Sequence, residues 1–104
     1  MTKNYEVKMM YYIRFGFGNE YAYEKGEKTL DKTRSVIISY LKLKQMAHSD
    51  VKLSSALIYK AKNKDGYIGK VVVKNDLCWW VTYGTIQQLS ENGKVKKLMT
   101  GLPL

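Results

Sequence analysis

A chain of 104 residues with 45% apolar residues can bury one compact core, so we expect a single α+β domain spanning residues 1–104. Its formal net charge of +9 favours nucleic acid, anionic surfaces or acidic protein surfaces as partners. The only cysteine, Cys78, excludes an intrachain disulfide, and no apolar run reaches membrane-spanning length. We therefore expect a cytoplasmic protein that makes no contact with membranes.

Lysine outnumbers arginine sixteen to two, and residues 51–104 carry nine of the lysines. Arginine is the side chain suited to bidentate recognition of guanine and phosphate. A lysine excess therefore indicates electrostatic attraction more than base-specific recognition. The same excess is what an AT-rich genome produces without any functional meaning, and composition alone leaves both explanations open.

The first predicted strand covers residues 5–17, where side chains alternate strictly between two faces. One face holds Tyr5, Val7, Met9, Tyr11, Ile13, Phe15 and Phe17. The segment from Gly16 to Asn19 predicts a bend, and the alternation of residues 20–25 predicts a strand that pairs back as a hairpin.

Thr29 is a suitable N-cap for a helix that runs to about Ala47. Its predicted buried stripe consists of Leu30, Ile37, Tyr40, Leu41 and Leu43. Three consecutive β-branched residues, 36–38, oppose a helix, whereas the length without a turn residue favours one. Residues 48–52 predict a loop.

The segment Asn63-Lys64-Asp65-Gly66 has the chemistry of a three-residue hairpin loop, with Asn63 capping the turn and Gly66 as the left-handed residue of a bulge. Such a loop pairs Leu57 with Val73, Tyr59 with Val71 and Ala61 with Gly69 on one apolar face. On the opposite face it pairs Ile58 with Val72, Lys60 with Lys70 and Lys62 with Ile68. A two-residue loop would mix lysines with valines on both faces, so the pattern favours three residues.

Asn75-Asp76 predicts a two-residue turn into the next strand, which places Cys78 and Trp80 on the apolar face. The other face then combines lysines with aromatic rings and is the candidate nucleic-acid-binding surface. Its predicted contact residues are Lys60, Lys62, Lys70, Lys74, Trp79 and Tyr83. The alternative is that Trp79, Val81, Val72, Ile58 and Ile68 form a second buried layer with the lysines at its rim.

Residues 85–99 contain Asn92-Gly93 between Glu91 and Lys94, which predicts a hairpin turn whose flanking charges pair. The competing interpretation is a short helix from Thr85 that ends at Gly93. Together the elements predict an α+β fold with a curved antiparallel sheet of about five to seven strands, in the order ββαβββ(ββ), and one main helix near 29–47.

No pattern of catalytic or metal-binding residues stands out. His48-Ser49-Asp50 has the residue types of a hydrolytic triad, but three neighbours on a loop cannot converge as a triad must. One histidine and one cysteine do not make a zinc site, and Cys78 is expected to be an inert core thiol. We therefore expect no enzymatic activity, no metal and no cofactor.

Two functions from different classes fit these features. The first is a small, basic, non-enzymatic module that contacts the backbone of DNA or RNA, without sequence preference, through the lysine and aromatic face. The alternative is a protein-binding effector of the type encoded by phages or mobile elements, which inhibits a host or defence enzyme by covering its surface. Exposed aromatic residues such as Tyr12 and Trp79 would then contribute most to binding.

Overall fold

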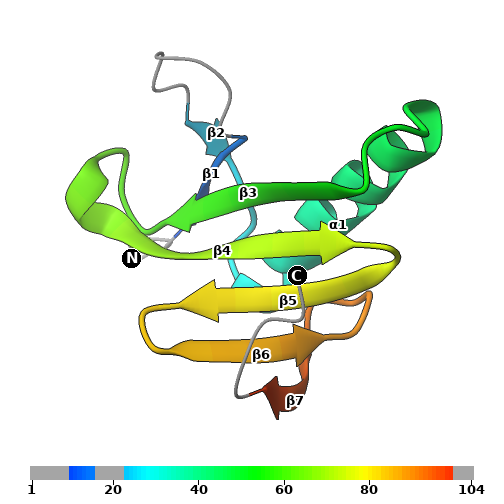
Figure 1. Cartoon of the computed structure of the whole chain (residues 1–104). Coiled ribbons are helices and arrows are strands. Elements are labelled where there is room, and N and C mark those ends of the chain that lie inside the picture. The colour runs from blue at the N-terminus through cyan, green and yellow to red at the C-terminus, as the bar shows by residue number, and fades with distance from the viewer. Residues whose placement is uncertain (1–9, 16–22, 100–104) are drawn as a thin grey trace, which may run out of the picture.

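The computed structural model describes residues 10–15 and 23–99, with the backbone alone for residues 97–99. In these ranges the chain forms β1 (Tyr12–Arg14), β2 (Glu24–Lys25), α1 (Leu30–Ala47), β3 (Leu53–Tyr59), β4 (Tyr67–Lys74), β5 (Leu77–Thr82), β6 (Thr85–Leu89) and β7 (Val95–Met99). The strands build one antiparallel sheet in the spatial order β2-β1-β3-β4-β5-β6-β7, and α1 covers one of its faces (Figure 1). The predicted α+β class, with a curved antiparallel sheet and one helix, is confirmed.

β1 shows the predicted alternation. Ile13 is buried and pairs with Ile58, whereas Tyr12 and Arg14 are half-buried. β2 pairs back on β1, with Glu24 opposite Ile13, as the predicted hairpin requires. Residues 5–9 and 16–22 of these predicted strands lie outside the described residues, and the described flanks Met10, Tyr11 and Phe15 are not in the strand.

The helix begins and ends where the sequence predicts. The Thr29 side chain accepts a hydrogen bond from the Lys32 amide at 3.2 Å, and the last helical residue is Ala47. Its buried side chains are Thr33, Arg34, Ile37, Ile38 and Leu41. The prediction was wrong for Tyr40 and Leu43, which are 48% and 64% exposed.

The hydrophobic core lies between α1 and the sheet face that the helix covers. Strands β3, β4 and β5 contribute alternate residues to it, because side chains on a strand point to opposite faces, and β1 and β6 contribute one residue each. Its buried members are Ile13, Ile37, Ile38, Leu41, Ala56, Ile58, Val71, Val73, Cys78, Trp80 and Leu89. The predicted placement of Cys78 and Trp80 beside Val73 and Val71 is confirmed.

The predicted register of the β3–β4 hairpin was wrong. Val73 pairs with Ser54 instead of Leu57, and Lys70 pairs with Leu57 instead of Lys60. The shift is three residues, so the side chains of β3 occupy the opposite faces from those predicted. Ile58 joins the core, and Lys60 and Lys62 lie outside the ladder.

The cause is a longer connection between the two strands. Residues 60–66 form the loop, with a short 3-10 helix at Lys64–Gly66, and a bulge interrupts the ladder at Ile58/Tyr59. Asn63 caps the turn as predicted, accepting from the Gly66 amide at 3.0 Å, but Gly66 is not left-handed.

Both later hairpins exist, with one correction. Asn75 and Asp76 have φ of 50° and 69°, as a tight two-residue turn needs, so that prediction is confirmed. The chain from 85 to 99 is a hairpin and not a helix. Glu91 does not pair with Lys94, however, because its carboxylate lies 3.4 Å from Lys42 Nζ on the helix.

The turn between β6 and β7 packs directly on α1. Arg34 Nε donates to the Gly93 carbonyl at 2.7 Å in a buried setting, and Ser35 Oγ donates to the Glu91 carbonyl at 3.1 Å. The Arg34 guanidinium also pairs with Asp31 at 2.7 Å and lies 5.2 Å from the centre of the Trp80 ring. We call this set of contacts the helix–turn junction.

No helix in the described ranges is both long enough and apolar enough to cross a membrane.

Candidate nucleic-acid interface

The candidate interface lies on the sheet face opposite α1, which we call the helix-free face. Antiparallel pairing arranges its side chains in rows that run across the strands. Leu57, Lys70 and Val81 share one such row, and Tyr59 and Tyr67 are opposite one another in the next. Lys70 therefore lies one row from a pair of tyrosines.

Four tyrosines form a continuous series of ring contacts at the end of the sheet where the β3–β4 loop lies. The ring centroids are 4.9 Å apart for Tyr23 and Tyr59, 5.5 Å for Tyr59 and Tyr67, and 6.0 Å for Tyr67 and Tyr83. All three contacts are edge-to-face, the geometry that aromatic pairs favour. We call Tyr23, Tyr59, Tyr67 and Tyr83 the tyrosine row.

Exposure increases towards one end of the tyrosine row. Tyr59 is 4% exposed, whereas Tyr83, in the turn between β5 and β6, is 89% exposed. That turn and the β3–β4 loop lie at the same end of the sheet (Figure 1). The row thus ends in an aromatic ring that solvent or a ligand can reach.

The β3–β4 loop brings lysines to the same end. Lys60 and Lys62 are exposed, and Lys62 Nζ lies 5.4 Å from the centre of the Tyr12 ring. Backbone hydrogen bonds hold the loop, since the Lys60 amide donates to the Gly66 carbonyl at 2.7 Å. The loop ammonium groups and the open end of the tyrosine row therefore share one region of the molecule.

Two predicted contact residues do not belong to this region. Lys74 ends β4, four residues beyond Lys70 and so about 13 Å further along the strand, at the opposite end of the sheet. Trp79 lies on the helix-free face as predicted, but it is only 2% exposed. The prediction that its ring is open to ligands was wrong.

The burial of Trp79 agrees in part with the alternative of a second buried layer. Val72, its cross-strand neighbour, is also 2% exposed. Ile58, which that alternative placed in the same layer, instead belongs to the core beneath α1. Among the described residues, no acceptor lies within hydrogen-bond distance of the buried Trp79 Nε1.

Sequence reasoning missed Tyr23, Tyr59 and Tyr67. The wrong register placed Tyr59 on the face away from the lysines, and nothing local links the four tyrosines. One signal was present: Tyr59 and Tyr67 flank the loop on both sides, and Tyr83 precedes the glycine of the next turn at that end.

Within the tyrosine row, the Tyr67 hydroxyl is suited to donating a hydrogen bond. Burial raises the pKa of Tyr67 above its ordinary value, and Tyr83 and Tyr59 raise it further. The Tyr67 hydroxyl is therefore protonated at neutral pH and can donate a hydrogen bond to an acceptor such as a phosphate oxygen.

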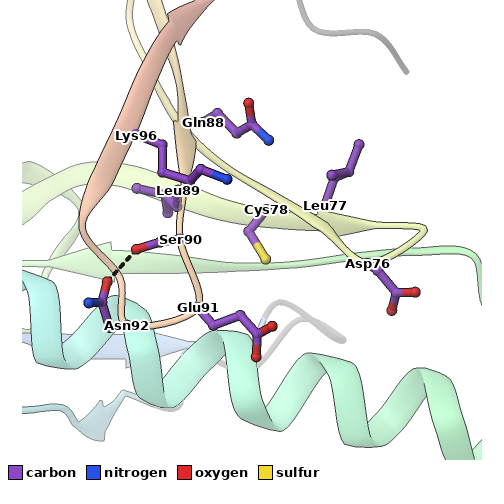
Figure 2. A pocket seen from close by; sticks show the side chains of 9 residues that line it. All are labelled: Asp76, Leu77, Cys78, Gln88, Leu89, Ser90, Glu91, Asn92 and Lys96. Atoms are coloured by element: carbon purple, nitrogen blue, oxygen red, sulfur yellow. Dashed lines mark hydrogen bonds between the residues drawn. The ribbon is translucent and has the colours of Figure 1, made fainter.

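A separate hollow of about 480 Å³ lies at the other end of the sheet, between the β4–β5 and β6–β7 turns. Figure 2 shows Cys78 directed towards the side of helix α1, with Asp76 and Glu91 also lining the hollow. In the described part of the chain, no three histidine, cysteine or acidic side chains are grouped to hold a metal ion. Burial is the main cause that raises the pKa of Cys78. The thiol is therefore protonated at neutral pH and weakly nucleophilic.

Stability is expected to fall in mildly alkaline solution because of Cys78. Its folded pKa is raised, so the thiol stabilises the fold below the unfolded pKa of about 8.5, and this contribution is lost as pH rises through the folded pKa. Urea unfolding at pH 7 and pH 9.5 should show a smaller decrease for Cys78→Ala than for the parent protein. An equal decrease in both would contradict burial of the thiol.

Comparison of the chain with protein-family models, with curated proteins and with solved structures found no match.

Proposed function

We propose that this protein is a small, non-enzymatic module that binds the backbone of single-stranded nucleic acid without sequence preference. The observation that carries the proposal is Tyr83, a ring that is 89% exposed yet contacts Tyr67 of the tyrosine row. The exposed lysines of the β3–β4 loop lie at the same end of the sheet as Tyr83. The chain as a whole has a net charge of +9. A basic surface with an accessible aromatic ring is typical of proteins that bind single strands.

Each group has a distinct role in this proposal. Lys60, Lys62 and Lys70 attract phosphates, and the Tyr83 ring stacks on one base. Stacking requires an unpaired base, because base pairs within a duplex already stack on their neighbours. Binding of single strands is therefore expected to depend on Tyr83, and binding of duplexes is not.

The first test is the salt dependence of binding to a fluorescently labelled single-stranded oligonucleotide. A Lys60→Gln/Lys62→Gln variant is expected to bind about tenfold more weakly at 50 mM salt. The slope of log affinity against log salt should fall by roughly 1.4, since each phosphate contact on a single strand contributes about 0.7. Fluorescence anisotropy titrations at several salt concentrations measure both quantities.

A matched variant controls for net charge. Lys52→Gln/Lys96→Gln removes the same two charges from exposed sites outside the loop, so it should weaken binding less. Equal losses in the two double variants would show that total charge, and not this interface, determines binding. An affinity weaker than about millimolar at low salt, or one that does not change with salt, would contradict the proposed function.

The role of the aromatic ring has its own test. Tyr83→Ala should weaken single-strand binding by about fivefold or more, because one stacked base contributes about 1–3 kcal/mol. Tyr83→Phe keeps the stacking surface and should bind as the parent protein does. A Tyr83→Ala variant with unchanged single-strand affinity would remove stacking from the proposal.

A further inference from the structure

Helix α1 exposes apolar side chains on the flank that does not face the core. Val36, Tyr40 and Leu43 are 47%, 48% and 64% exposed, and Ala47 continues the same flank. Their spacing is four, three and four residues, which aligns side chains along one side of an α-helix. We call Val36, Tyr40, Leu43 and Ala47 the helix stripe.

The helix stripe is not needed to build the core. The face of α1 that packs on the sheet is already supplied by Ile37, Ile38 and Leu41, each at most 1% exposed. Tyr40, within the stripe, is held in position, because its ring lies 4.6 Å from the ring of Phe15. Contiguous apolar side chains on a surface helix are typical of a binding site for another macromolecule.

We propose that the helix stripe binds an acidic amphipathic helix of a partner protein. This surface is separate from the nucleic-acid interface and goes beyond the proposed function. The alternation of four and three residues is the pattern with which two helices pack along their length. A partner helix with apolar residues at the same spacing would cover the stripe.

Charge determines which partner helix fits. Exposed Lys32 lies four residues before Val36, and half-buried Lys44 lies four residues after Tyr40. Both are therefore neighbours of the helix stripe on a chain of net charge +9, whereas Arg34 is buried and paired with Asp31. A partner with glutamates beside its apolar stripe would meet complementary charge. A second copy of this chain would bring the same cations and another +9, so charge disfavours self-association.

The probe for this proposal is a fluorescently labelled synthetic helix of about three heptads, with leucine at the a and d positions and glutamate at the e and g positions. A second peptide has lysine in place of every glutamate. The acidic peptide should bind the full-length protein, and the basic peptide should bind at least about tenfold more weakly, as charge complementarity requires.

Substitution identifies the surface that the peptide uses. Leu43→Ser should weaken binding of the acidic peptide by about tenfold, because it removes a large exposed apolar side chain from the centre of the stripe. Leu77→Ser is the matched control, since Leu77 is a 47% exposed leucine on β5, away from the helix, and its loss should not change peptide affinity. Circular dichroism checks that both variants fold.

Three results would overturn the proposal. They are acidic-peptide binding weaker than about millimolar, equal binding of the two peptides, or equal effects of Leu43→Ser and Leu77→Ser. A further contradicting result would come from sedimentation equilibrium. If the protein alone forms a dimer and Leu43→Ser abolishes that dimer, the stripe binds a second copy of this chain instead. Oligonucleotide affinity should be unchanged in Leu43→Ser, so failure of this proposal is distinguishable from failure of the proposed nucleic-acid function.

Discussion

Gly93→Ala is expected to destabilise the fold by about 4 kcal/mol, the largest effect of any single substitution proposed for this chain. Gly93 has φ of 82°, and an added Cβ would lie 2.0 Å from the Asp31 carbonyl oxygen of α1. The left-handed conformation costs about 1 kcal/mol for alanine, and forcing the turn away from the helix adds about 3 kcal/mol. Urea unfolding measures the loss.

Gly84→Ala separates the two contributions. Gly84 has φ of 76°, close to that of Gly93, but an added Cβ would meet no atom within 4 Å. Its substitution should therefore cost only about 1 kcal/mol, the conformational part alone. Similar losses for the two variants would show that the β6–β7 turn does not pack on α1 as described.

Arg34→Met is expected to cost about 3 kcal/mol. It leaves the buried Gly93 carbonyl without its donor, which costs about 1–3 kcal/mol, and removes the cation next to the Trp80 ring, worth about 1 kcal/mol. Burial lowers the pKa of Arg34, but an arginine remains charged at neutral pH, so the lost donor is a charged one. Thermal and urea unfolding of the variant measure the effect.

Asp31→Asn tests whether Arg34 stabilises the fold mainly through its ion pair with Asp31 or through its hydrogen bond to the Gly93 carbonyl. The Asp31 side chain is 47% exposed, so solvent screens its interaction with Arg34. Asparagine keeps an oxygen at the same place, and the expected loss is at most about 1 kcal/mol. A loss as large as that of Arg34→Met would make the ion pair, and not the Gly93 carbonyl, the main contribution of Arg34.

Local signals in the sequence predicted the parts of the fold that depend on local chemistry. Thr29 caps the helix because its side chain reaches the Lys32 amide, which involves only neighbouring residues. Asn75 and Asp76 tolerate the positive φ of a tight turn, which is again a local property. The helix bounds and the β4–β5 register followed from these signals.

The β3–β4 register could not be predicted because two signals were ambiguous. Asn63 and Gly66 do form a capped turn, but this turn lies inside a longer loop, so it does not report where pairing begins. The apolar run Val71–Val73 is buried on both faces of the sheet, so alternation fits either register. The error moved Tyr59 to the wrong face and concealed the tyrosine row.

The positions of the candidate contact residues were predicted only in part, because they also depend on contacts that local patterns do not specify. Lys60, Lys62, Lys70 and Tyr83 were selected from composition and placement; the β3–β4 loop with the first two lysines and the β5–β6 turn with Tyr83 lie at the same end of the sheet, whereas Lys70 lies within β4 (Figure 1). The burial of Trp79 and the position of Lys74 depend on tertiary packing and on distance along β4, which local patterns do not specify. The exposure of Tyr40 and Leu43 was missed because apolar residues occupy most of the helix circumference between 36 and 43.

The contact between Arg34 and Gly93 joins residues 59 positions apart, whereas β3 to β6 each pair with the next strand along the chain. During synthesis, the strands from β3 onward can associate in succession as they leave the ribosome. The guanidinium of α1 obtains its carbonyl acceptor only after nearly all of the sheet has emerged. Long-range closure of this kind is slow relative to neighbouring-strand pairing, so attachment of the last hairpin to the helix is expected to be a late event in folding.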